Sequence, residues 1–380
     1  MDFYHAAVRP LLFRLDAETS HRAAVRAAGA LGRSRAALGA LEQRMGLRDP
    51  ALRTTVAGID FPGPVGLAAG FDKNAEAIAV TSRMGFGFVE VGSVSEHPSA
   101  GNAARPRIWR LPADEALRVY YGCPNDGAEA VSARLRRQSA RVPLGVNVVE
   151  TNTGRLAAAA QAADEIACAI GRFVGLADYL VLNLSCPNMP HGGCGLFDDT
   201  DDLRLLLRNV ARISGLPPVF LKLTPPGDPE DPRVIEPILA TVDPFGFVKG
   251  FILNIPNRRP RESLRIPEAE LASTRGGITG PLLRAATNAA IRAWYARIDR
   301  RRHVLIGTGG IGSAVDAYET IRHGASLVQL YTALVYRGPG LVARINEGLA
   351  RLLARDGLRS IAEAVGTEDG GRIRLGAMEA

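Results

Sequence analysis

Eight short apolar runs, each followed by a segment of helical periodicity, constrain the fold of this chain more than any other feature. The runs occupy residues 65–69, 88–94, 144–149, 179–184, 219–223, 251–255, 303–307 and 327–331. They are rich in Val, Ile and Leu and show little polar alternation, which is typical of parallel strands buried on both faces. Helical segments follow at 74–84, 127–138, 157–174, 201–213, 232–241, 281–297, 313–322 and 339–354. This alternation predicts an α/β fold, a (β/α)8 TIM barrel.

The chain is long enough for one large domain and smaller additions. We expect residues 1–47 to form an N-terminal helical lobe, residues 48–365 the barrel, and residues 366–380, which have little apolar content, a loose tail. The stretch 95–141 after the second strand is long and contains a part rich in Pro, Gly and Arg. A connection of that length predicts an insertion over one mouth of the barrel.

The N-terminal lobe has two interpretations. Its pattern predicts a helix over Ala17–Leu31 with Asp16 as N-cap. Its apolar faces are punctuated by six arginines: Arg9, Arg14, Arg22, Arg26, Arg33 and Arg35. The lobe is either a helical pair that caps the main domain or a basic amphipathic element that lies on a membrane surface and admits an apolar substrate.

Composition excludes several classes of protein. With 47% hydrophobic and 22% charged residues, the chain is neither disordered nor fibrous. The net charge of +7 favours anionic ligands or a membrane surface, but no basic run is interleaved with aromatics, so we expect no nucleic-acid partner. Four cysteines without a CxxC pair predict a reducing, cytoplasmic location and no metal site. No run of about 18 apolar residues predicts a membrane span, although peripheral attachment stays open.

Polar residues gather where the predicted strands end, which is where TIM barrels place their active sites. They are Lys73, Ser93, Asn147, Asn183, Cys186, Asn188, Lys222 and Asn254. Only three of the 46 basic residues are lysines, and two of those stand here, as expected at sites that require a compact amine. Asparagine amides both donate and accept hydrogen bonds, so a ring of them suits a planar heterocycle.

A second cluster indicates a phosphate site. Gly309 and Gly310 follow the seventh strand, and Tyr331 and Thr332 follow the eighth. The loops after strands 7 and 8 are the usual phosphate-binding loops of such barrels. The first cluster thus suits a planar heterocycle, and the second suits a phosphate group.

Nine motifs, in order, resemble the dihydroorotate dehydrogenases, and in length and layout their membrane-associated, quinone-using class. They are GLAAGFDKNAE (66–76), MGFGFVEVGSV (84–94), the GN…RPR segment ending at Arg107, LGVNV (144–148), LNLSCPN (182–188), LKL (221–223), GGITG (276–280), IGTGGI (306–311) and GASLVQLYT (324–332). The resemblance covers about residues 3–350. It implies FMN, a quinone acceptor and the oxidation of dihydroorotate to orotate in pyrimidine biosynthesis.

The resemblance also implies roles for individual residues. Ala69, Gly70, Lys73 and Ser93 would pack on the isoalloxazine ring. Asn147, Asn183 and Lys222 would bond its polar edge, where a cation stabilises the reduced ring. Gly280, Gly309, Gly310, Tyr331 and Thr332 would hold the phosphate. Lys73, Asn183, Asn188 and Asn254 would bind substrate, and Cys186 would be the catalytic base.

The chain departs from the family in its substrate pocket. Quinone-using members usually carry Ser at the base position, whereas Cys is typical of the soluble class. Val119 stands where an Asn normally binds the carboxylated pyrimidine, and Leu253 and Ile255 replace the threonines of a Thr-Asn-Thr triplet. Further changes are Val149, Glu150 and Thr151 for Gly-Lys-Asn, and a longer loop at 189–196 that is a candidate lid.

Three alternatives to dihydroorotate oxidation therefore stay open. The first is a diverged paralogue that oxidises another small amide or imide in a specialised biosynthetic pathway. The second is a flavin-binding barrel without turnover. The third is a phosphate-handling barrel without flavin, such as an isomerase or lyase.

Overall fold

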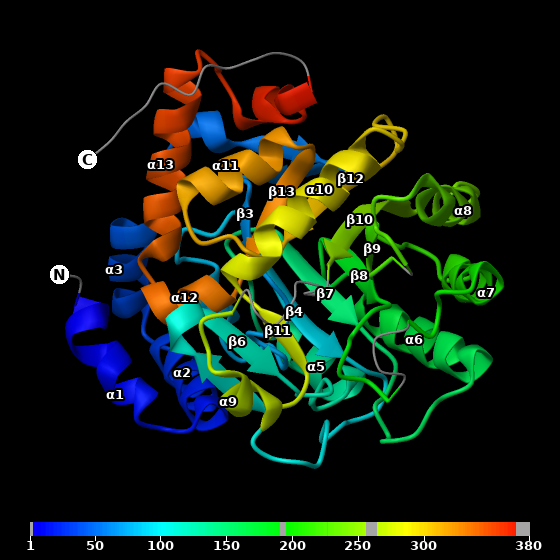
Figure 1. Cartoon of the computed structure of the whole chain (residues 1–380), viewed down its shortest axis with the longest axis horizontal. Coiled ribbons are helices and arrows are strands. Elements are labelled where there is room, and N and C mark those ends of the chain that lie inside the picture. Colours follow the sequence, from blue (N-terminus) through cyan, green and yellow to red (C-terminus); the bar gives the residue numbers. More distant parts are fainter. Residues whose placement is uncertain (1–2, 191–194, 226, 256–263, 370–380) are drawn as a thin grey trace.

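The predicted barrel is confirmed. The computed structural model describes residues 3–190, 195–225, 227–255 and 264–369. Eight parallel strands close on themselves in chain order, so that each strand pairs with the next and the last with the first. They are β3 (Val65–Leu67), β4 (Phe88–Val94), β7 (Leu144–Val148), β8 (Tyr179–Asn183), β9 (Val219–Leu223), β10 (Val248–Asn254), β12 (Val304–Thr308) and β13 (Ala325–Leu330). Figure 1 shows this barrel with its helices around it.

The surrounding helices follow the predicted segments. They are α4 (Ile78–Thr81), α5 (Ala128–Leu135), α6 (Ala159–Phe173), α7 (Thr200–Ala211), α8 (Pro232–Val242), α10 (Arg284–Tyr295), α11 (Ala314–Arg322) and α13 (Leu341–Arg355). Their apolar faces pack on the outside of the strands and form the main core. A further short helix, α12 (Thr332–Arg337), directly follows β13 and was not predicted.

The helix predicted over 74–84 is wrong at both ends, because α4 spans only Ile78–Thr81. The Asp72 carboxylate accepts hydrogen bonds from the backbone N–H groups of Glu76 and Ala77, at 2.8 and 2.7 Å. Ala75 has a left-handed φ of 60°, which interrupts helical geometry. The side-chain bonds of Asp72 therefore hold a loop at this barrel mouth in place of a first helical turn.

The opposite end of the barrel is closed by a hairpin that the sequence analysis did not identify. Strands β1 (Thr54–Val56) and β2 (Ile59–Phe61) pair antiparallel. Their side chains Val56 and Phe61 pack with inward-facing barrel residues such as Phe88, Tyr179 and Phe220. The barrel interior is thus filled at its bottom, and the open end is the one where the strands' carboxyl ends lie.

A three-stranded antiparallel sheet lies over that open end. Strands β5 (Ile108–Leu111) and β6 (Ala116–Val119) come from the insertion predicted at 95–141. The third strand, β11 (Gly277–Thr279), comes from the connection between β10 and β12 and pairs with β6. Beside it lies α9 (Glu268–Ala272), whose Leu271 packs with Leu111 and Ala116 of the sheet.

The N-terminal lobe consists of a π-helical turn, η1 (Tyr4–Val8), and helices α1 (Arg9–Phe13), α2 (Ala17–Leu31) and α3 (Arg35–Met45). The predicted bounds of α2 are confirmed, and the Asp16 side chain accepts a hydrogen bond from the Thr19 N–H at 2.9 Å. A buried ion pair joins Glu18 of α2 to Arg107 beside β5. Figure 1 places this lobe, in blue, against the same side of the barrel as the covering sheet.

The short helices η6 (Ile361–Ala364) and η7 (Thr367–Asp369) follow α13, and residues 370–380 of the predicted tail lie outside the described residues. Among the helices that are described, none combines the length and the apolar character needed to cross a bilayer.

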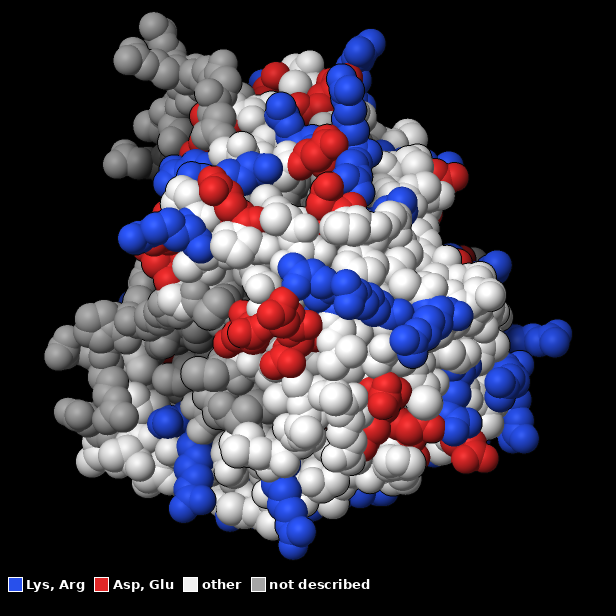
Figure 2. All heavy atoms as spheres, turned by 90° about the vertical axis from the view of Figure 1, so that its right-hand side faces the viewer, with Lys and Arg blue, Asp and Glu red and all other residues white. Residues whose placement is uncertain are grey.

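The face that carries α7 and α8 has mixed charge. Figure 2 shows acidic side chains between the basic ones on this side of the molecule. Arg204 pairs with Asp201 on α7, and Arg233 pairs with Asp231 at the start of α8. Basic side chains here are thus partly neutralised by neighbours on their own helix.

Candidate active site

A cavity of about 420 Å³ opens at the carboxyl ends of the strands, beneath the covering sheet. Its volume falls in the ordinary range for small-molecule sites. Thirteen of the predicted site residues line it: Ala69, Gly70, Lys73, Ser93, Asn183, Cys186, Asn188, Lys222, Gly280, Gly309, Gly310, Tyr331 and Thr332. Asn147 is fully buried behind the wall, and the side chain of Asn254, at the end of β10, lies outside what the structure describes.

A buried hydrogen-bond chain connects the cavity to the barrel centre. The Asn183 amide donates to Ser93 Oγ at 2.8 Å, and Ser93 Oγ donates to Asn147 Oδ1 at 2.5 Å. The Asn147 amide donates in turn to Glu90 Oε1 at 2.8 Å. Asn147 is therefore a positioning residue, which fixes the orientation of the two side chains in front of it.

Glu90 is the end point of this chain and was not identified from the sequence. Besides Asn147, it accepts hydrogen bonds from Gln329 Nε2 at 2.6 Å and from the Tyr179 hydroxyl at 3.4 Å. Burial raises the pKa of the Glu90 carboxyl, and the ammonium of Lys222 opposes that shift. One buried acid on β4 thus orders residues on three other strands, β7, β8 and β13.

We expect Glu90→Gln to lower the free energy of unfolding by about 2 kcal/mol. The carboxylate accepts hydrogen bonds from three donors, whereas the amide N–H of glutamine would point at one of these donors and leave it buried without an acceptor. Urea denaturation would measure the change. Glu347→Gln, on the exposed side of α13, is the control and should stay within about 0.5 kcal/mol of the parent. Equal stabilities for all three proteins would contradict this role of Glu90.

The two predicted lysines lie on different walls of the cavity. Lys73 donates to the Gly70 carbonyl at 2.6 Å, and its ammonium stands 4.3 Å from the ring centre of Tyr121. Burial lowers the pKa of Lys73 to about 8. Lys222 is presented by β9 beside Asn183, its partner in strand register.

Two thiols meet in the wall of the cavity. Cys186 follows β8 and Cys123 follows β6, and their Sγ atoms are 3.4 Å apart. The hydrogen bond from Cys123 lowers the pKa of the Cys186 thiol, against the effect of burial. The same bond, with burial, raises the pKa of Cys123 well above its usual value. Cys186 is consequently the thiol that ionises first.

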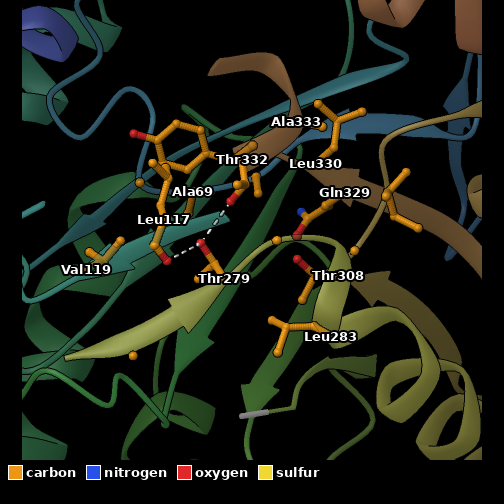
Figure 3. A pocket seen from close by; sticks show the side chains of 18 of the residues that line it. Ala69, Leu117, Val119, Thr279, Leu283, Thr308, Gln329, Leu330, Thr332 and Ala333 are labelled. Carbon is orange, nitrogen blue, oxygen red and sulfur yellow. Dashed lines mark hydrogen bonds between the residues drawn. The ribbon is translucent and has the colours of Figure 1, made fainter. Parts of the chain in front are cut away.

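The other end of the cavity is built from glycines and hydroxyls. Gly280, Gly309 and Gly310 have φ values of 136°, 113° and 78°. A Cβ on Gly310 would lie 2.6 Å from the backbone N of Arg284. Figure 3 shows Thr279 of β11 pointing toward Thr332, with their Oγ atoms 2.8 Å apart. Backbone N–H groups and hydroxyls in such a tight cradle are suited to an anion.

The Tyr331 side chain does not face this cradle. Its hydroxyl is 3.3 Å from His21 Nδ1 of α2, and its ring packs against Phe71. Tyr331 could therefore contact a phosphate only through its backbone. Its side chain instead joins the barrel to the N-terminal lobe.

Several residues that line the cavity were not predicted from the sequence. These are Cys123, Thr279 and Gln329, together with two arginines in ion pairs, Arg284 with Asp316 and Arg337 with Glu115. Their partners are distant in sequence, so no spacing indicated them. Cys123 lies four positions after Val119, which departs from the family pattern, and that departure was the one available signal.

The residues present fit a flavin nucleotide. Three buried side-chain oxygens in the cavity wall have no partner among the described residues: Asn183 Oδ1, Asn188 Oδ1 and Gln329 Oε1. Unpaired buried acceptors of this kind indicate donors on a ligand. The glycine cradle lies at the far end of the same cavity, as a ring with a phosphorylated tail requires.

Comparison with known proteins gives the class of this protein. The sequence model of the dihydroorotate dehydrogenase family matches residues 51–353. The chain therefore belongs to the dihydroorotate dehydrogenase family, and it is a flavin-dependent oxidoreductase.

Its relatives narrow this class. The chain is 40% identical over 376 residues to a dihydroorotate dehydrogenase (quinone) of Rhodospirillum rubrum, covering 97% of this chain and 95% of that one. Identity to the corresponding protein of Anaeromyxobacter sp. is 41% over 370 residues, covering 95% and 96%. The crystal structure of ligand-free DHODH from Eimeria tenella superposes with a TM-score of 0.76 at 30% identity, covering 90% and 98%. The predicted family, its quinone-dependent type and the barrel are thus confirmed.

Proposed function

We propose that the protein binds FMN and oxidises dihydroorotate, or a close analogue, to the corresponding unsaturated ring. One observation carries this proposal: Cys186 occupies the predicted base position inside the cavity, with a second thiol 3.4 Å away that favours its ionised form. Asn183 and Asn188 add unpaired acceptors to the same cavity.

The residues of the cavity divide the reaction between them. Cys186 Sγ takes the proton from one substrate carbon, while Cys123 donates a hydrogen bond to the thiolate beforehand. Lys73 neutralises an anionic group of the substrate, and Asn188 orients a ring N–H. A flavin bound here would supply the hydride acceptor for the neighbouring carbon. Gly280, Gly309, Gly310 and Thr332 would hold its phosphate, and Lys222 would stabilise negative charge at its polar edge.

A second cavity supports a quinone as the electron acceptor. It measures about 360 Å³ and lies between α2 and the barrel. Its lining combines the rings of His21 and Phe71 and the side chain of Val25 with charged side chains such as Glu18, Arg22 and Arg107. Lys73 and Tyr121 line both cavities, so the two meet at these side chains. Burial lowers the pKa of His21 to about 3, so its imidazole is neutral at physiological pH. An acceptor entering through the N-terminal lobe would come within reach of the flavin ring here.

The outer surface of the lobe supports peripheral membrane attachment. Phe3, Leu11, Leu15 and Leu31 are among the few large apolar side chains that are exposed, at 75%, 63%, 46% and 43%. Arginines interleave with them along α1 and α2. Apolar anchors beside cationic groups suit the surface of an anionic bilayer.

Anaerobic mixing with dihydroorotate tests the proposed function. We expect rapid loss of the oxidised-flavin absorbance, followed by reoxidation when a soluble quinone is added. A flavin that stays oxidised at millimolar dihydroorotate would contradict this substrate. A colourless purified protein that fails to take up FMN would contradict the cofactor.

The apolar part of the cavity favours a second candidate, a paralogue with another amide or imide substrate. Ile108, Leu117 and Val119 of the covering sheet line the cavity. Val119 offers no hydrogen bond to a carboxylated pyrimidine, and each lost partner would weaken binding by roughly 1–3 kcal/mol. Flavin reduction by a less polar cyclic imide, but not by dihydroorotate, would favour this candidate.

Binding of an anionic substrate or product should depend on the charge of Lys73. The ammonium form prevails below pH 8 and is lost above it, because burial lowers the pKa of Lys73 to about 8. We therefore expect the Kd for orotate to rise by up to tenfold per pH unit above about pH 8. Titration of flavin absorbance between pH 6.5 and 9.5 would measure it. Lys73→Ala should bind orotate weakly, without this dependence; an unchanged profile in the variant would contradict the assignment.

A further inference from the structure

Cys123 and Cys186 form a pair that base catalysis alone does not require. They belong to two loops, one after β6 of the covering sheet and one after β8 of the barrel. Their Sγ atoms are 3.4 Å apart, and both thiols line the cavity. A single thiol is sufficient as a proton acceptor, whereas two thiols in contact are also a substrate for two-electron oxidation.

We propose that Cys123 and Cys186 are a peroxide-sensitive redox site, and that their oxidation to a disulfide switches the enzyme off. The consequence for catalysis rests on the proposed role of Cys186 as the base. The formation of the disulfide does not, since it depends only on the proximity of the two sulfurs.

The geometry allows the bond without rearrangement of the barrel. An S–S bond of about 2.05 Å requires the two sulfurs to approach by about 1.4 Å, which is within the range of side-chain rotation. Cys123 has a left-handed φ of 53°, in a turn after Gly122 with φ 65°. Its position is held by Asn125, whose amide donates to the Cys123 carbonyl at 3.0 Å. The chain thus presents one thiol to the other from a fixed turn.

The environment selects the attacking sulfur. Cys186 receives the hydrogen bond from Cys123 and carries the negative charge more readily, and a thiolate is the nucleophile toward peroxide. Cys168, by contrast, lies exposed on α6, on the outside of the barrel. Peroxide that enters the cavity should therefore react at Cys186, with Cys123 in place as the resolving thiol.

The reaction balances in two steps with a peroxide as the oxidant. The Cys186 thiolate attacks one oxygen of hydrogen peroxide, the O–O bond breaks, and a sulfenic acid forms while hydroxide takes up a proton to become water. The Cys123 sulfur then attacks the Cys186 sulfur, the S–O bond breaks, and hydroxide leaves with the Cys123 proton as a second water. Two sulfurs lose two electrons in total, and both peroxide oxygens are reduced.

The disulfide would act on the site in two ways. It would remove the proton acceptor at Cys186. It would also join the loop of the covering sheet to the loop after β8 inside the substrate part of the cavity. A dithiol reductant would reverse both effects by thiol–disulfide exchange.

The test uses the FMN-loaded enzyme with Cys168 and Cys194 replaced by serine, which leaves Cys123 and Cys186 as its only cysteines. Trypsin places Cys123 on peptide 119–134 and Cys186 on peptide 173–204. The replacement of Cys194 leaves Cys186 as the only cysteine of peptide 173–204. After treatment with hydrogen peroxide we expect these peptides to be linked with the loss of two hydrogens. Flavin reduction by substrate should fall at least 100-fold and recover with dithiothreitol.

The variant Cys123→Ser supplies the control. Without the resolving thiol, peroxide should drive Cys186 to sulfinic acid, and dithiothreitol should restore no activity. Peroxide that leaves both thiols free in the parent, or that gives sulfinic acid at Cys186 without a cross-link, would overturn the inference. Dihydroorotate could also fail to reduce the flavin of a protein that still forms the cross-link. That result would support the redox site and contradict only the proposed function.

Discussion

Cys186→Ala should lower the rate of flavin reduction by substrate by roughly 10²–10⁴-fold, the usual contribution of a positioned general base. The Kd for FMN should stay within about twofold of the parent value, because the substitution removes only the thiol, to which we assign no contact with the cofactor. Anaerobic stopped-flow absorbance would give the reduction rate, and fluorescence titration of FMN the affinity. In the parent the rate should rise with pH as the Cys186 thiol ionises, from a pKa that the Cys123 hydrogen bond holds below its usual value.

Two further variants sharpen this expectation. Cys186→Ser places a hydroxyl at the base position, so the variant should retain partial activity. The rise of its activity with pH should occur at a higher pH than the rise in the parent. Cys168→Ser, on the exposed face of α6, should reduce its flavin at the parent rate. Fast flavin reduction in Cys186→Ala would assign the proton acceptor to another group.

Gly310→Ala should raise the Kd for FMN at least 100-fold. Gly310 has a φ of 78°, and a Cβ there would stand 2.6 Å from both the backbone N and the Cβ of Arg284. Backbone at the start of α10 cannot give way as a flexible side chain would, so the loop after β12 and α10 must separate. That movement opens the cradle in which we place the phosphate. Fluorescence quenching of added FMN would measure the effect.

The matched control is Gly357→Ala. Gly357 has a similar φ of 70°, but a Cβ there would meet nothing within 4 Å. It carries the backbone strain of a left-handed alanine, about 1 kcal/mol, and leaves the cradle untouched. Unchanged FMN affinity in both variants would place the phosphate elsewhere. Unchanged affinity for riboflavin in Gly310→Ala, with loss only for FMN, would strengthen the assignment to the phosphate.

The strands of the barrel were predictable because their signal is local. A run such as 219–223 is apolar throughout, since both of its faces are buried, and the structure places β9 over the same residues. The helix α2 was equally local, with Asp16 capping it as the sequence indicates. Segment 74–84 was mispredicted because the Asp72 side chain accepts hydrogen bonds from two backbone N–H groups and so competes with helix formation. This interaction leaves no trace in the spacing of apolar residues, from which the helix was predicted.

The covering sheet shows the limit of local signals. Its strand β11 is three residues long and pairs with β6, which lies more than 150 residues earlier in the chain. Neither segment has a distinct strand pattern, because each is stabilised mainly by pairing with the other. The insertion at 95–141 was therefore predictable from the sequence, whereas its partner strand was not.

The sequence by itself determined the order of strands and helices, the family motifs and the residues at the strand ends, because periodicity and motif spacing are properties of contiguous chain. It also marked Lys73 and Lys222 as two of only three lysines. Only the tertiary structure decided that Glu90 orders Asn147 and Gln329, and that Cys123 touches Cys186. Those contacts join residues 57 or more positions apart, and barrel closure, rather than any local preference, brings them together.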